Sequence, residues 1–163
     1  MRLPRDAELP AHLVTLIRLQ FLHGLLVVAV ATGIWLPAPA VAHGWLPLVP
    51  LLVAIFLLLP SGLYLGAEVQ RGEATLTPAV LLLWLLASAT PFVPALIAAL
   101  LMIVAVMLLF LMEKVAAIRE HWPEAWLRGR RQHMQFQMVS LASVVFWLFS
   151  RDNQLLLNLG LGG

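Results

Sequence analysis

The sequence predicts an all-α protein: a polytopic transmembrane helical bundle with four spans and a fifth whose signal is weaker. Composition is the first observation behind this prediction, since 62% of the 163 residues are hydrophobic and 11% are charged, with a mean hydropathy of +0.95. Soluble domains carry about one quarter charged residues, so this chain has too few polar groups to cover its apolar surface in water. We therefore expect lipid around most of the protein, and the length suits a single domain over residues 1–163.

The spacing of the apolar runs is the second observation. A helix needs roughly 20 apolar residues to cross about 30 Å of hydrocarbon. The apolar runs lie at about 19–36, 46–67, 76–90, 92–112 and 134–150. Between the third and fourth runs, Pro91 and Pro94 predict a tight helical hairpin, because proline removes a backbone donor and disfavours helical geometry in the residue before it. The fifth run contains glutamine and serine, so it either crosses the membrane or lies in its interface.

The second run contains a candidate helix break at Pro60, Ser61 and Gly62. A proline and a glycine within a span interrupt the helical hydrogen-bond ladder and free backbone carbonyls. Broken helices form binding sites in transporters whose repeated halves carry paired breaks. This sequence shows no repeat, so we favour a kinked packing helix over a binding site.

Lysine and arginine gather in alternate loops. Nine of the ten are Arg2, Arg5 and Arg18 before or at the first run, Arg71 after the second, and Lys114, Arg119, Arg128, Arg130 and Arg131 in the basic loop 113–132. The loops between them, "PAPAVAHG" and "ATPFVP", contain neither residue. The tenth, Arg151, breaks the pattern and lies beside Asp152 after the fifth run. Because the cytoplasmic side of a membrane protein is the side rich in these cations, we expect a multi-pass protein of the bacterial inner membrane. Its N-terminus and basic loop are expected to be cytoplasmic.

Several of these side chains are expected to meet lipid headgroups. Arg18 lies at the boundary of the first run, where its guanidinium can reach phosphate. In the basic loop, tryptophans suit the headgroup level and arginines suit anionic phosphates. The predicted headgroup residues are Arg18, Trp122, Trp126, Arg128, Arg130 and Arg131. No extended basic surface accompanies them, so nucleic acid is not an expected partner.

His23 is the ionisable side chain that lies deepest within an apolar run, about 7 Å beyond Arg18 along a helix. The simpler interpretation is a neutral histidine that bonds across to a neighbouring helix. The sharper one is a ligand of b-type haem or a contact to a quinone. A bis-histidine haem site needs a second histidine at matching depth, and only His133 can approach His23. We therefore name His23 and His133 as candidate cofactor residues, while expecting no cofactor.

The chain offers no evident catalytic constellation. All eight acidic residues map to loops or run ends. Coupled transport and aspartyl hydrolysis would instead need carboxylates deep within the membrane. Cysteine is absent, which excludes thiol nucleophiles and thiolate metal sites. Ser61 lacks the preceding glycine of a nucleophile elbow. Whether the chain is an enzyme is left open, but these observations argue against it.

The sequence therefore favours a non-catalytic accessory or assembly subunit of a larger membrane complex. Its expected partners are other membrane subunits and anionic lipids. The alternative is a carrier or redox anchor for a small hydrophobic molecule, haem or quinone, centred on His23.

Overall fold

The computed structural model describes residues 11–36, 39–114, 118 and 122–158, and the regular elements within them are all helical. They are α1 (Ala11–Gly33), α2 (Pro39–Trp45), α3 (Leu48–Arg71), α4 (Thr77–Ala89), the 3₁₀ turn η1 (Thr90–Phe92), α5 (Ala95–Met112) and α7 (Glu124–Asn158). The predicted all-α bundle is confirmed.

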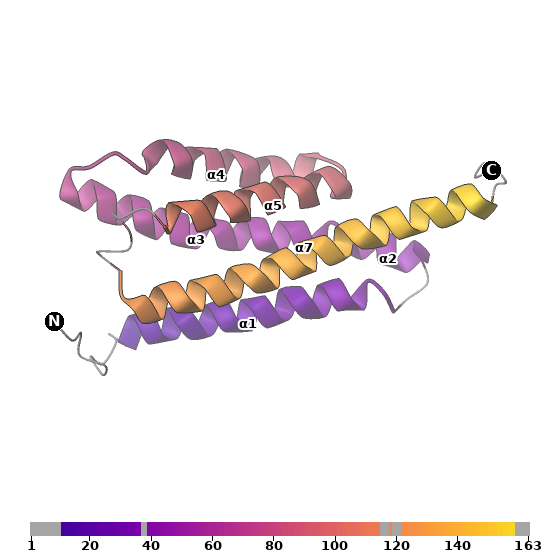
Figure 1. The fold of residues 1–163 in the computed structure, drawn as a ribbon, viewed down its shortest axis with the longest axis horizontal. Helices are drawn as coiled ribbons and strands as arrows, with labels where there is room; N and C mark the ends of the chain where they lie inside the picture. The colour runs from indigo at the N-terminus through magenta and orange to yellow at the C-terminus, as the bar shows by residue number, and fades with distance from the viewer. Residues whose placement is uncertain (1–10, 37–38, 115–117, 119–121, 159–163) are drawn as a thin grey trace.

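The helices form two packed groups (Figure 1). In one group, α1 and α7 lie side by side and run in the same direction. In the other, α3, α4 and α5 pack on one another with alternating directions, and α5 and α3 both contact α7. The start of α1, the α3–α4 loop and the connection from α5 to α7 therefore lie at one end of the bundle, which we call the basic end. Arg71, Lys114 and Arg128 lie at or near this end.

Three helical segments are long and apolar enough to cross a membrane. They are Leu13–Gly33, Ala42–Arg71 and Ala95–Met112. The second of them contains the second predicted run, and the other two cover most of the first and fourth runs. The third run, 76–90, forms the shorter helix α4, whose 13 residues extend only about 20 Å. The prediction of four spans is therefore supported for three runs. The α4 helix begins only at Thr77, and it ends at Ala89, shortly before Pro91.

The run 134–150 lies within α7, a single helix of 35 residues. Its first turns carry the charged part of the basic loop, so this loop is helical over its second half. The structure thus joins the fifth run and the basic segment in one rigid element.

Glu68 organises the loop between α3 and α4. Its carboxylate is fully buried and accepts hydrogen bonds from the backbone N–H of Leu76, at 2.6 Å, and from the hydroxyls of Thr75 and Thr77. Gly72 ends α3 in the left-handed region, with a φ of 71°, which favours glycine. The turn therefore closes on a carboxylate that α3 itself provides.

The candidate break at Pro60, Ser61 and Gly62 does not occur, because α3 continues through all three residues. Ser61 lies buried in the helix, where its hydroxyl donates to the carbonyl of Leu57 at 2.7 Å. The same hydroxyl accepts a hydrogen bond from Trp84 Nε1 on α4 at 3.0 Å. Packing of α4 against α3 thus satisfies the polar group beside the proline, and the helix remains intact.

Gly24 permits the close approach of α1 to α7. A Cβ atom at this position would lie 2.8 Å from Cδ2 of Phe136 and 3.3 Å from Cδ2 of His133. The first distance is shorter than Cβ atoms show in proteins and the second is unusually tight, so a side chain at this position would require Phe136 to shift. This approach brings the neighbouring His23 within reach of α7.

The arrangement generates a test of orientation. The chain has no native cysteine, so single cysteines can be introduced by Gly44→Cys, Glu73→Cys and Ala125→Cys, all at exposed positions. If the basic end is cytoplasmic, a membrane-impermeant maleimide added to intact cells should label only position 44. Positions 73 and 125 should react after permeabilisation. Labelling of position 125 in intact cells would contradict this topology.

Candidate functional site

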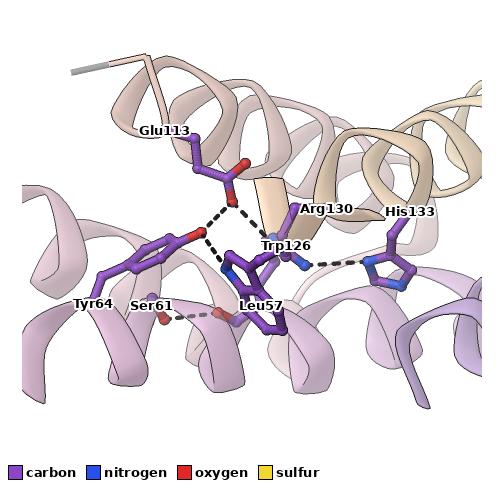
Figure 2. Close-up of polar contacts among 7 residues, drawn as sticks. All are labelled: Leu57, Ser61, Tyr64, Glu113, Trp126, Arg130 and His133. Carbon is purple, nitrogen blue, oxygen red and sulfur yellow. Dashed lines mark hydrogen bonds and ion pairs between the residues drawn. The ribbon is translucent and has the colours of Figure 1, made fainter. Parts of the chain in front are cut away.

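A chain of buried polar groups links α5, α7, α1 and α3. It consists of Glu113, Arg130, His133, His23 and the main-chain carbonyl of Leu52, and we call it the buried polar chain. Arg130 donates from Nε to Glu113 Oε1 at 3.0 Å, and its Nη1 lies 3.3 Å from His133 Nδ1 (Figure 2). The chain continues from His133 Nε2 to His23 Nδ1 at 2.8 Å, and from His23 Nε2 to the Leu52 carbonyl at 3.1 Å.

The guanidinium at one end of this chain, which only donates, and the carbonyl at the other, which only accepts, together determine the direction of every hydrogen bond between them. A carbonyl oxygen only accepts, so His23 carries its proton on Nε2 and its Nδ1 accepts. His133 therefore donates from Nε2, and its own Nδ1 accepts from the guanidinium of Arg130. All donors point from Arg130 towards Leu52, and both imidazoles are neutral in this arrangement.

The ion pair between Arg130 and Glu113 is fully enclosed, with side-chain exposures of 1% and 4%. Glu113 follows the last residue of α5, and Arg130 lies in the second turn of α7. Tyr64 of α3 donates its hydroxyl to the same oxygen, Glu113 Oε1, at 2.8 Å, and Trp126 Nε1 approaches the Tyr64 hydroxyl at 3.4 Å. Figure 2 shows Tyr64 of α3 and Arg130 of α7 both bonded to the carboxylate of Glu113, at the end of α5, with Trp126 bonded to the Tyr64 hydroxyl. The pair therefore fastens α3, α5 and α7 together near the basic end.

Phe56 holds the two imidazoles from the α3 side. Its ring stacks on His23 with a centroid distance of 4.0 Å and an interplanar angle of 17°, and its centroid lies 4.8 Å from that of His133. An aromatic face on one side and hydrogen bonds at both nitrogens leave His23 little rotational freedom. The side chain is thus positioned as a bridge between helices.

A groove lies on the outside of this chain, between α1 and α7. Its volume is about 430 Å³, and we call it the α1–α7 groove. It is lined by Ile17, Arg18, Phe21, Leu22, Gly129, Gln132, His133 and Phe136. Because both ring nitrogens of His133 are engaged inside the bundle, the polar side chains left to face a ligand are those of Arg18 and Gln132.

The structure brings His23 and His133 together, and α7 is the element that does so. A metal ion requires about 2.0–2.1 Å to an imidazole nitrogen, so two ligating nitrogens on opposite sides of it would lie about twice as far apart. The observed separation of 2.8 Å is that of a hydrogen bond. Haem binding by this pair would require the rings to separate.

Two of the residues predicted to contact lipid headgroups, Trp126 and Arg130, do not lie at the surface. Trp126 and Arg130 are fully buried, one turn apart on the face of α7 that packs on the bundle. The physical reason is the carboxylate of Glu113, which draws Arg130 inward. Arg18, Arg128 and Arg131 are exposed, and Trp122 is half-buried.

Sequence reasoning placed Glu113 only at a run end and did not assign it to a site. The signal that could have found the pair is the coincidence of Trp126 and Arg130 at helical spacing, following a run that ends in a glutamate. Helical spacing puts residues four apart on one face. The spacing thus places Trp126 and Arg130 on one helix face, but it does not show that Glu113 contacts that face.

Removing one partner of the ion pair should lower the free energy of unfolding more than removing both partners. Arg130→Met would leave the Glu113 carboxylate enclosed without its cation, and the expected loss of unfolding free energy is about 3–5 kcal/mol. The double variant Glu113→Leu with Arg130→Met removes both charges and should retain more stability than the single variant. Denaturation with sodium dodecyl sulfate in mixed micelles, followed by tryptophan fluorescence, measures both. Arg128→Met is the matched control, because its pair with Glu124 is exposed and contributes roughly 0–1 kcal/mol. A control as damaging as Arg130→Met would contradict the interpretation.

Comparisons of the chain with protein-family models, with curated proteins and with solved structures find no match, so its function is argued from the geometry of its own residues.

Proposed function

We propose that this protein is a non-catalytic accessory or assembly subunit of a larger membrane complex. The observation that carries the proposal is the termination of the buried polar chain in a main-chain carbonyl. Both nitrogens of both histidines are engaged with protein groups. A general base needs a free acceptor within reach of a substrate proton, and neither imidazole offers one. The chain is therefore suited to holding helices in register.

The exterior of the bundle supports the same proposal. The described loops are short turns, so a partner would contact the helices themselves within the membrane. One wide apolar face of α1 is uncovered and consists of Leu19, Phe21, Leu22, Leu25 and Leu26. α7 adds exposed Val139, Phe146 and Phe149. Faces of this kind pack on lipid or on another transmembrane helix.

The proposal includes a location and a lipid environment. We place the protein in the bacterial inner membrane with its basic end towards the cytoplasm, on the strength of the alternating distribution of lysine and arginine. Arg18, Arg128 and Arg131 are then exposed at the level where anionic headgroups lie. Half-buried Trp122 suits the same interface.

A second candidate function is the carrier or redox anchor for haem or a quinone. The presence of the α1–α7 groove directly beside His133 favours it. In this alternative, His133 and His23 would exchange their mutual hydrogen bond for contacts to the bound molecule. The two functions therefore make opposite demands on the same pair of imidazoles.

Purification in a mild detergent, followed by native mass spectrometry and an absorption spectrum, distinguishes the two functions. The subunit proposal expects a second protein at fixed stoichiometry and no Soret band. A chain that is isolated without a protein partner, and that carries haem or quinone at one equivalent, would contradict it and establish the carrier.

Substitution of His23 gives an independent test. His23→Gln keeps one donor and one acceptor, so it should assemble with stability close to that of the parent. His23→Leu leaves the Nε2–H of His133 without an acceptor, and the expected loss is about 1–3 kcal/mol of unfolding free energy. Co-purification of the partner and denaturation in mixed micelles are the measurements, with His43→Gln, an exposed histidine of α2, as control. A His23→Gln protein that is folded and assembled but without function would overturn the structural role.

A further inference from the structure

We infer that the α1–α7 groove binds one anionic phospholipid, with its phosphate at Arg18 and Gln132 and an acyl chain along Phe21, Leu22 and Phe136. This inference concerns the outer surface of the bundle. It goes beyond the proposed function, because a lipid site is compatible with an accessory subunit and with a carrier alike.

The order of polar and apolar residues along the groove matches the order of groups in a phospholipid. On α1, Arg18 precedes Phe21 and Leu22, and on α7, Gln132 precedes Phe136. Because α1 and α7 run in the same direction (Figure 1), Arg18 and Gln132 both lie nearer the basic end than Phe21, Leu22 and Phe136, and of the apolar lining side chains only Ile17 precedes Arg18. A headgroup at the basic end and a chain directed towards the middle of the bundle is the orientation of a lipid in its own leaflet.

The charge of the groove selects an anionic headgroup. Arg18 is exposed, none of the lining residues is acidic, and the ion pairs between described residues do not include Arg18. A guanidinium presents several N–H donors in a plane that fits phosphate oxygens. The amide of Gln132 adds further donors. Since the nitrogens of His133 are engaged inside the bundle, these two side chains alone would bind the headgroup.

The apolar part of the groove favours an acyl chain over a compact ligand. Phe21 and Leu22 are 51% and 61% exposed, so the groove is open along its lipid-facing side and does not enclose its occupant. Its volume of about 430 Å³ lies within the range of about 300–1,000 Å³ found for small-molecule sites. Near a membrane surface, phospholipids carry both a phosphate and acyl chains, and among them the anionic ones are attracted by arginine.

Native mass spectrometry of the full chain in detergent tests the proposal. The delipidated protein is mixed with phosphatidylglycerol and phosphatidylcholine of identical acyl chains, and the bound lipids are counted. We expect one phosphatidylglycerol to be retained in preference to phosphatidylcholine. Arg18→Gln should lower this preference about fivefold, the effect of one arginine near the surface. Arg131→Gln is the matched control, because Arg131 is exposed and does not line the groove, and it should leave the preference nearly unchanged.

A second pair of variants tests the chain-binding part without altering charge. Leu22→Trp narrows the groove and should lower retention of both lipids, while Leu25→Trp, exposed but outside the groove, should not. Equal effects of Arg18→Gln and Arg131→Gln, or no preference in the parent protein, would reduce the lipid contact to a general surface attraction and overturn the site. Occupation of the groove by a helix of a co-purified protein, with no lipid retained, would overturn it as well.

Discussion

The enclosed ion pair between Glu113 and Arg130 is the interaction on which the arrangement of this bundle depends. Helices surrounded by lipid gain little from hydrophobic burial, because lipid tails are as apolar as leucine. Their association needs van der Waals contact and polar groups that prefer one another to the surroundings. The carboxylate of Glu113 collects Arg130 and Tyr64 from two other helices, so a single charge fixes the relative positions of α3, α5 and α7.

The histidines extend this connection to α1. Arg130 cannot give up a proton in a protein, so its contact with His133 makes that imidazole an acceptor and passes the direction of bonding on to His23. A relay of protons from Glu113 to the histidines is thereby disfavoured, since Arg130, which lies between them, always remains protonated. The close approach at Gly24 and the stacking of Phe56 complete the contact. Electrostatic and steric constraints thus meet at the same turn of α1.

Much of the fold could be predicted from the sequence, because the apolar composition and the lengths of the apolar runs indicate helices surrounded by lipid. The all-helical bundle and the pairing of His23 with His133 rest on such reasoning. The length of α4 could not be predicted, because it depends on where the loop closed by Glu68 ends. Ser61, beside the proline in the continuous α3, bonds to Trp84, a residue 23 positions later. The burial of Arg130 and Trp126 depends on Glu113. Each of these outcomes is determined by a contact between segments distant in the sequence, and the hydrophobic pattern of the sequence does not reveal such contacts.

The unequal lengths of the helices have a consequence for the bilayer itself. The α4 helix covers about 20 Å and α7 about 52 Å, against a hydrocarbon thickness of about 30 Å. A segment that is too short draws the two leaflets together, whereas one that is too long tilts or projects beyond them. The apolar part of α7, residues 134–150, extends only about 26 Å, so its length alone would not thicken the membrane, whereas a bilayer bordering the shorter α4 would be thinned beside it. A bilayer around this bundle would then be thinner beside α4 than beside the longer helices α1, α3 and α5, and neighbours with matching hydrophobic lengths would gather on different sides of it.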